Sequence, residues 1–347
     1  MLGLFYGLKP AAPPIFTTAP FLVSPHLRQR LFWNGFWSAI LAGCAFSWAG
    51  GAWAQSPTAY PSRAVKWIVP FAAGGSGDTI ARLLAERMAH ALGQPVLIDN
   101  RAGANGMIGS EMVAKAPKDG YTLMVTTEAT VTSNLHLYKR LPYDPVRDFE
   151  PVTQISSGAY MMVVHPSVPA KTVKEFIALA KRRPGEINFA SSGANNLLAM
   201  EMFNFMAGVK TVNIPYKGTG QAVQALLSGE VQVFVISPIV GMQLVKSGKL
   251  RLLGMTGLQR SPLLPEAPTV AETLPGFEYV VGHGVVVTAK TPPAIINKLA
   301  QEIIRITKLP DFRERLNSQG LDVIGSTPST LTLLSCSTKD SMALSSP

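Results

Sequence analysis

From Val65 onwards the chain alternates between short β-rich runs and amphipathic stretches with helical spacing. Val65–Phe71 is an apolar, β-branched run that predicts a buried strand, and Asp78–Ala91 has the spacing of an amphipathic helix. This alternation is typical of βα units built around a mostly parallel sheet. The sequence therefore predicts the α/β class.

The units form two consecutive sets, and 347 residues are enough for two domains. The second set begins with a predicted strand at Met161–Val164. We interpret the apolar run Tyr279–Val287 as the segment by which the chain crosses back to the first set. We therefore expect two lobes, each a mostly parallel sheet flanked by helices. Lobe 1 combines residues 55–160 with 281–328, and lobe 2 spans 161–280. Further strands are predicted over 96–99, 121–126, 187–190, 212–214, 231–236 and 250–255, and helices over 108–115, 173–182, 197–207, 221–227, 292–307 and 310–318.

Residues 1–54 form an N-terminal extension that resembles an export signal. Two arginines, Arg28 and Arg30, precede an apolar stretch, and Ala52-Trp53-Ala54 has the small-x-small form that signal peptidase cleaves. We expect cleavage before Gln55. A membrane span is the competing interpretation, which the glycines of this stretch disfavour. Leu41-Ala42-Gly43-Cys44 resembles a lipobox, so a lipoprotein anchored at Cys44 is the alternative.

Charge and cysteine content exclude several classes of function. The formal net charge is +10, and residues 55–347 hold 28 basic against 21 acidic residues, a balance of +7 without a dense basic run. A nucleic-acid partner is therefore not expected. The two cysteines are Cys44 and Cys336, so the chain that starts at Gln55 has no intramolecular disulfide and no cysteine-based zinc site. We expect no cofactor and no metal.

Two glycine-rich loops join a predicted strand directly to a predicted helix. The first is Ala73-Gly74-Gly75-Ser76-Gly77-Asp78, and the second is Asn100–Gly106. Glycines allow close approach of the backbone to a ligand, and a helix N-terminus attracts anions such as carboxylates. Asp78 also suits a helix cap, and Arg101 suits a structural ion pair. A dinucleotide fingerprint is incomplete, because Ile80 occupies its third glycine position.

An ordered series of motifs from Tyr60 to Thr327 resembles one known family. The motifs are Tyr60-Pro61-Ser62-Arg63, Val69-Pro70-Phe71 with Gly74-Gly75 and Asp78, Asn100-Arg101-x-Gly103-Ala104-x-Gly106, Asp119-Gly120-Tyr121-Thr122-Leu123, Leu141-Pro142-Tyr143-Asp144-Pro145-x-x-Asp148-Phe149 and Pro215-Tyr216-Lys217-Gly218. They resemble the Bug-type receptors of tripartite tricarboxylate transporters. The resemblance implies a periplasmic two-lobed binding protein of the Venus-flytrap type that closes about a hinge.

The resemblance also implies a ligand and its partners. The ligand is a small carboxylate or an amino acid, bound largely by backbone amides. The partners are the membrane subunits of a tripartite transporter or, alternatively, a membrane signalling protein that senses the bound state. The receptor is expected to be a monomer. By similarity the ligand-binding residues would be Gly74, Gly75, Ser76, Asp78, Asn105, Gly106, Thr126, Thr127, Ser191, Ser192 and Gly193.

Several segments depart from the pattern of this family. The segment Asn195–Leu198 is about two residues shorter than the corresponding segment of the relatives, which affects the helix start in lobe 2. Val235 replaces a frequent aspartate, and Gly282 replaces a frequent tryptophan. The tail 329–347 lacks the expected amphipathic helix, which predicts reduced stability. An enzyme is not expected, because no GxSxG motif is present and the histidines lack metal-ligand spacing.

Overall fold

The computed structural model describes residues 60–262 and 264–327. The predicted signal peptide, the lipobox at Cys44 and the aberrant tail lie outside the described residues. Within the described part of the chain, no helix is long and apolar enough to cross a membrane.

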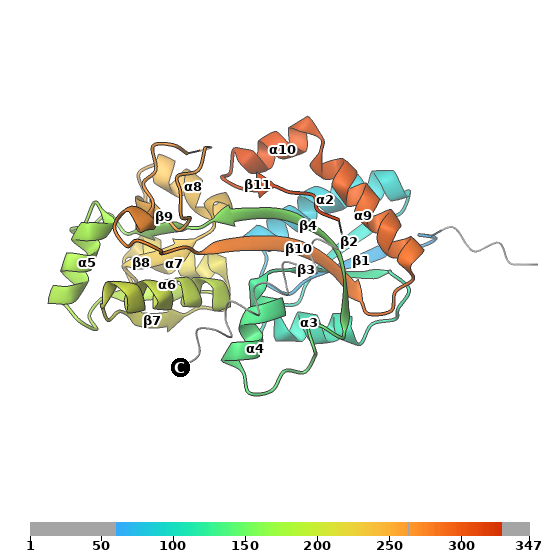
Figure 1. Ribbon diagram of the computed structural model, residues 1–347, viewed down its shortest axis with the longest axis horizontal. Helices are drawn as coiled ribbons and strands as arrows, with labels where there is room; N and C mark the ends of the chain where they lie inside the picture. The colour runs from blue at the N-terminus through green and yellow to red at the C-terminus, as the bar shows by residue number, and fades with distance from the viewer. Residues whose placement is uncertain (1–59, 263, 328–347) are drawn as a thin grey trace, which may run out of the picture. The chain divides into compact units, whose positions relative to one another are not determined.

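A six-stranded mixed sheet forms the core of the first lobe (Figure 1). Its order is β11-β4-β10-β3-β1-β2. The central strand β1 pairs in parallel with β2 and β3, whereas β10 is antiparallel to both β3 and β4. The strands are β1 (Val65–Val69), β2 (Val96–Asn100), β3 (Thr122–Thr126), β4 (Phe149–Ala159), β10 (Val280–Thr288) and β11 (Asp322–Val323).

A five-stranded mixed sheet forms the second lobe, with the order β7-β6-β8-β5-β9. Strand β6 is parallel to β7 and β8, and β5 is antiparallel to β8 and β9. The strands are β5 (Met161–Val164), β6 (Asn188–Ser191), β7 (Val212–Pro215), β8 (Val233–Ile236) and β9 (Arg251–Met255).

The chain passes between the two sheets at the ends of two long paired strands. Strand β4 ends at Ala159 and β5 begins at Met161, so only Tyr160 separates the sheets there. The return is made by β10, which pairs with β4 along its length from Val280 to Thr288. The predicted two-lobed α/β class is confirmed. The expectation that each sheet is mostly parallel is wrong. Both sheets are mixed, because the crossing strands β4, β5 and β10 pair with their neighbours in the antiparallel sense.

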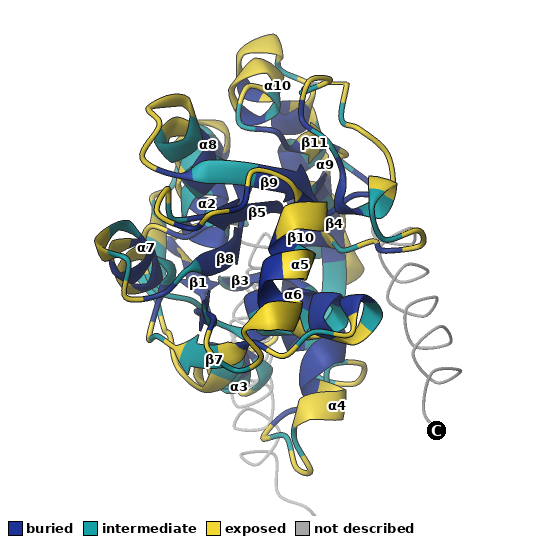
Figure 2. Ribbon diagram, turned by 90° about the vertical axis from the view of Figure 1, so that its left-hand side faces the viewer, coloured by how far each residue is buried: buried dark blue, intermediate teal, exposed yellow. Residues whose placement is uncertain are grey.

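Helices cover both faces of each sheet, and the central strands are buried between them, whereas the edge strands β2 and β7 stay partly exposed (Figure 2). Alternate residues of β1 explain this arrangement, because Val65, Trp67 and Val69 enter one apolar cluster and Ile68 enters the cluster on the opposite face. In lobe 1, α2, α9 and α10 cover one face and α3 the other. In lobe 2, α5 and α6 cover one face, and α7 and α8 the other.

The helices and short helical turns have the following bounds. They are α2 (Ser76–Leu92), η1 (Ala104–Gly106), α3 (Met107–Ala114), η2 (Ala129–Ser133), α4 (Asn134–Leu137), α5 (Val173–Arg182), α6 (Ala194–Ala207), α7 (Thr219–Ser228), α8 (Pro238–Lys246), η3 (Val270–Glu272), α9 (Pro293–Thr307) and α10 (Pro310–Asn317).

Candidate functional site

Four helix N-termini from the two lobes converge on one cavity. Helix α2 follows β1 in lobe 1, and α6, α7 and α8 follow β6, β7 and β8 in lobe 2. Their N-cap residues are Gly75, Gly193, Gly218 and Ser237, all four of which line the cavity, and none of these helices has a side-chain cap. The cavity thus lies outside the carboxyl ends of parallel strands, where open α/β sheets bind ligands.

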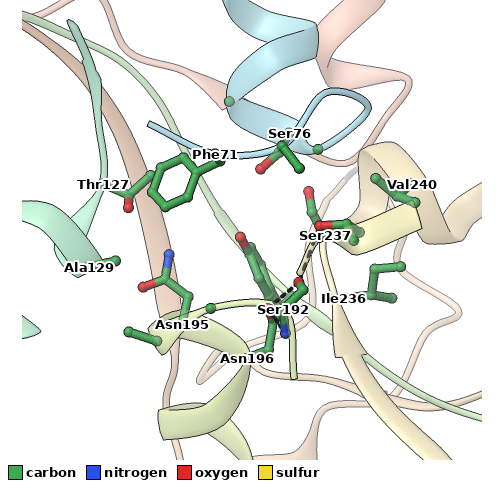
Figure 3. A pocket seen from close by; sticks show the side chains of 18 residues that line it. Phe71, Ser76, Thr127, Ala129, Ser192, Asn195, Asn196, Ile236, Ser237 and Val240 are labelled. Carbon is green, nitrogen blue, oxygen red and sulfur yellow. Dashed lines mark hydrogen bonds between the residues drawn. The ribbon is translucent and has the colours of Figure 1, made fainter. Parts of the chain in front are cut away.

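This cavity, called the first cavity below, is small and uncharged. About 60 Å³ of it is open to the centres of water molecules, several times the roughly 10–15 Å³ that one ordered water needs. None of the described residues that line it carries a formal charge. These residues, drawn as sticks in Figure 3, are Phe71, Ala72, Gly75, Ser76, Gly77, Thr127, Ala129, Tyr160, Ser192, Gly193, Ala194, Asn195, Asn196, Gly218, Thr219, Ile236, Ser237 and Val240.

Three polar atoms in the wall of the first cavity are buried without a hydrogen-bond partner among the described residues. They are Thr127 Oγ1, Ser237 Oγ and Asn195 Oδ1. Thr127 and Ser237 are 6% and 5% exposed, and they approach the cavity from opposite lobes. A buried polar group without a partner is costly, so water or a ligand in the cavity would supply the missing hydrogen bonds.

Tyr160, the residue between the two sheets, joins the helix starts of both lobes. The side chains of Ser76 in α2 and Asn195 in α6 both interact with its hydroxyl group and favour its charged form. Burial, together with nearby Glu128, raises the pKa of the Tyr160 hydroxyl to about 12, so it stays neutral. Tyr160 therefore lines the cavity and connects the lobes at the same point.

His283 supports Ser76 from behind the first cavity. The Oγ of Ser76 lies 2.9 Å from Nε2 of His283, whose Nδ1 lies 3.3 Å from Ser156 Oγ. The ring is fully buried, and burial lowers the pKa of His283 to about 4. A neutral imidazole with hydroxyl groups at both nitrogens fixes the position of the Ser76 side chain.

Glu128 occupies the space that Gly282 leaves beside these residues. Its Oε1 accepts a hydrogen bond of 2.8 Å from the Gly282 N–H, and a Cβ at position 282 would lie 2.9 Å from that oxygen. Burial raises the pKa of Glu128 to about 7. A side chain at position 282 is therefore incompatible with this position of the Glu128 carboxyl group.

Asn196 stabilises the segment of lobe 2 in which α6 begins. Its Oδ1 accepts a hydrogen bond of 2.8 Å from Ser192 Oγ, and its Nδ2 donates to the Val235 carbonyl. The Ser192 hydroxyl also lies 3.2 Å from Thr219 Oγ1. These bonds, the dashed lines of Figure 3 among them, hold the starts of α6 and α7 together.

A second cavity adjoins the first one along a shared wall. It offers about 560 Å³ to the centres of water molecules, and Phe71, Ala72, Ser192 and Gly193 line both cavities. The second cavity differs from the first because a cationic side chain, that of Lys217, lines it.

The structure divides the predicted site residues among three places. Gly75, Ser76, Thr127, Ser192 and Gly193 line the first cavity. Ser192 and Gly193 also line the second cavity, where Asn105, Gly106 and Ser191 lie as well. Gly74, Asp78 and Thr126 line neither of them.

Asp78 and Thr126 make contacts within lobe 1. Asp78 is buried and accepts hydrogen bonds from the Gly74 N–H, Arg82 and Asn100. Burial works to raise its pKa, but the bonds from Arg82, Gly74 and Asn100 outweigh burial and lower it. Thr126 Oγ1 lies 2.7 Å from Thr130 Oγ1. Both residues support the loops and do not face the cavity.

Sequence reasoning missed Tyr160, Ser237, Asn195 and the supporting role of His283. Ser237 precedes Pro238, and a serine followed by proline at a helix start is a signal that could have indicated α8. No motif could have indicated the partnership of Ser76 and His283, which are separated by 207 positions. Among the described residues, no group of three His, Cys, Asp or Glu side chains is arranged to hold a metal ion.

Comparison with known proteins identifies the family. Residues 80–337 match the model of the tripartite tricarboxylate transporter family receptor, a match that extends past Thr327. The chain belongs to this family. It is a solute-binding receptor and not an enzyme.

Individual relatives agree with this assignment. The chain is 35% identical to protein BugT of Bordetella pertussis, over 82% of this chain and 89% of BugT. Among solved structures, Rpa4515 of R. palustris with adipate is 32% identical with a TM-score of 0.78, over 80% of this chain and 94% of that one. MatC of Rhodopseudomonas palustris with bound malate is 31% identical with a TM-score of 0.77, over 80% and 97%.

Proposed function

We propose that this receptor captures a small carboxylate in the first cavity and delivers it to the membrane subunits of a tripartite tricarboxylate-type transporter. The convergence of four helix N-termini without side-chain caps carries the proposal. Each N-terminus carries about half a positive charge on free N–H groups, which attracts an anion without any cationic side chain.

In this proposal the two lobes move relative to each other and close around the ligand. Residues 161–280 would move relative to 60–160 and 281–327, with Tyr160 at the crossing, and closure would surround the ligand. Rpa4515 and MatC were solved with adipate and malate, which supports a carboxylate ligand for a chain of the same fold. The N-terminal sequence supports export to the periplasm, with a cleaved signal peptide or an anchor at Cys44.

A thermal-shift screen of the purified protein tests the proposal. The panel contains malate, lactate, propionate, succinate and adipate, with glucose and urea at equal concentration as neutral controls. A ligand at 100 times its dissociation constant should add about 2.7 kcal/mol of stability. A rise in Tm with one or more acids supports the proposal. A cooperative melt that no acid shifts, even at millimolar concentration, contradicts it.

A further inference from the structure

Five connecting segments of lobe 2 meet at the end of its sheet that is opposite to the first cavity. Strands β6, β7 and β8 are parallel and their carboxyl ends face the cavity, so their amino ends lie together at the far edge. Backbone hydrogen bonds join the segments there, from the Gly185 N–H to the Lys210 carbonyl and from the His165 N–H to the Gln232 carbonyl. We call this end the lobe 2 tip, and it comprises residues 165–172, 181–187, 208–211, 229–232 and 246–251.

The lobe 2 tip carries almost all the net positive charge of residues 55–347. It holds eight basic residues against two acidic ones, Glu186 and Glu230, a balance of +6, whereas residues 55–347 as a whole have +7. The remainder of that stretch is therefore nearly neutral. The basic residues are dispersed along the sequence, and only the fold brings them to one end of the molecule. They are Lys171, Lys181, Arg182, Arg183, Lys210, Lys246, Lys249 and Arg251.

Most of these cations are available to a partner. All of them except Arg251 are exposed, and of the seven exposed ones Arg183 pairs with Glu186 at 2.9 Å. The other six form no ion pair within the part of the chain that the structure describes. Glu230 is engaged elsewhere, because its Oε1 accepts a hydrogen bond of 2.8 Å from the Tyr216 hydroxyl. Clustered cations without acidic partners attract an anionic surface.

Phe205 adds an exposed aromatic ring beside these cations. It lies in the last turn of α6, which leads into residues 208–211, and it is 88% exposed. Helix α6 has a single charged residue, Glu201, among its 14 residues, so its outer face offers little else that is charged. A phenylalanine surrounded by lysines and arginines is typical of protein surfaces that bind the headgroup region of a bilayer.

We propose that the lobe 2 tip binds the surface of a bilayer that contains anionic phospholipids, with its cations at the headgroup phosphates and Phe205 inserted among the headgroups. Five of the seven exposed cations are lysines. Lysine is depleted at protein–protein interfaces, whereas at an anionic lipid surface it contributes as much as arginine. The first cavity lies at the opposite ends of the strands, so it stays accessible to a ligand while the tip is bound.

Co-sedimentation of the purified receptor with vesicles tests the inference. Vesicles of equal parts phosphatidylglycerol and phosphatidylethanolamine are compared with phosphatidylcholine vesicles at about 0.05 M NaCl. We expect the receptor to partition at least about 100-fold more strongly onto the anionic vesicles. At about 1 M NaCl, where the screening length falls to about 3 Å, this preference should fall below about tenfold. Equal partitioning onto both kinds of vesicle would overturn the inference. Partitioning onto neither would also overturn it, and would indicate an acidic protein surface as the partner.

A charge variant with a matched control locates the contact. Arg182→Gln/Lys210→Gln removes two cations of the lobe 2 tip and should lower partitioning onto the anionic vesicles about 30-fold. Lys118→Gln/Lys308→Gln removes two exposed cations of lobe 1, and thus the same net charge, and should partition like the wild type. Equal losses in the two variants would overturn the inference, because the total charge and not the tip would then govern binding.

A second pair of variants tests the insertion of the aromatic ring. Phe205→Ser should lower partitioning onto the anionic vesicles at least about tenfold, because the buried area of the ring is lost. Val146→Ser is the control, since Val146 is an apolar residue of lobe 1 that is 60% exposed, and it should leave partitioning unchanged. Wild-type partitioning of Phe205→Ser would contradict the insertion. Thermal melts check that all four variants fold. The rise in Tm with a carboxylate should be the same in each of them, so a failure of the proposed function is seen separately.

Discussion

Gly218 of lobe 2 faces Ala72 of lobe 1 so closely that a Cβ at position 218 would lie 2.6 Å from the Ala72 Cβ. The backbone of Gly218 is extended, with φ of −172°, so an alanine there suffers no backbone strain. Glycine is required at this position because the two lobes leave no room for a side chain, and not because the backbone needs a conformation that only glycine adopts.

The variant Gly218→Ala should therefore weaken ligand binding. The added methyl group keeps the lobes apart, and we expect the Kd of the carboxylate to rise at least about tenfold, a loss of about 1.4 kcal/mol. Calorimetric titration measures the effect. Gly220→Ala, where a Cβ would meet nothing within 4 Å, is the control and should bind like the wild type. The double variant Ala72→Gly/Gly218→Ala should recover affinity; wild-type affinity in Gly218→Ala alone would contradict the account.

Tyr160→Phe should lower affinity more than it lowers stability. It removes the hydroxyl group with which Ser76 and Asn195 interact from opposite lobes, and a polar interaction of this kind contributes about 0.5–1.5 kcal/mol. The expected rise in Kd is about threefold to tenfold. Tyr143→Phe is the control, because its hydroxyl donates to the Thr130 carbonyl within lobe 1. That variant should lower Tm without changing Kd, and the reverse pattern would count against a bridging role for Tyr160.

Thr127→Val should weaken ligand binding without lowering the stability of the unliganded protein. The Thr127 hydroxyl has no partner within the described structure, so the isosteric valine should leave the unliganded Tm unchanged or higher. The same change should weaken carboxylate binding by about 1 kcal/mol. Thr130→Val gives the contrast, because Thr130 Oγ1 is hydrogen-bonded to Thr126 and Thr127 and its loss should lower Tm. Unchanged ligand affinity in Thr127→Val would show that this hydroxyl does not contact the ligand.

Glu128→Gln should stabilise the protein at neutral pH relative to the wild type. Burial raises the pKa of Glu128 from 4.5 to about 7. Below pH 4.5 the carboxyl group is mostly protonated in both states. Between about pH 4.5 and 7 the unfolded state alone gains free energy by ionising, and above pH 7 the folded state ionises as well. The wild type therefore loses about 2–3 kcal/mol across this window, and the glutamine does not.

Denaturant unfolding at pH 5, 6, 7 and 8 measures this difference. The advantage of the glutamine variant should grow from pH 5 to pH 7 and level off by pH 8. His283 has the opposite dependence, because its pKa is lowered to about 4 and its contribution is lost as pH falls. Comparing variant with wild type at each pH cancels that contribution. A difference independent of pH would mean that Glu128 is ionised in the folded protein.

Sequence patterns predicted elements that are amphipathic and well bounded. The helix predicted over 173–182 has the same first and last residues as α5. Thr172 caps its first turn, because its side chain accepts a hydrogen bond from the Glu175 N–H. By contrast, β4 was missed because Thr153 and Ser156 interrupt its apolar pattern. Both are buried, because β4 is paired with β10 on one side and β11 on the other.

The candidate site was only partly predictable for a related reason. The glycine loop before α2 follows local rules, and it does line the first cavity. Tyr160 lies at a strand crossing, and α8 is a short helix with Gly241 in its middle, so neither has a strong local pattern. Their place in the cavity depends on how the two sheets meet, which no single segment encodes.

The most direct test is a crystal structure of the receptor with the acid that gives the largest thermal shift. We predict the ligand carboxylate in the first cavity, within hydrogen-bond distance of N–H groups at the starts of α2 and of at least one of α6, α7 and α8, and of Thr127 or Ser237. A carboxylate bound to Lys217 in the second cavity, or held by one lobe alone, would contradict the account.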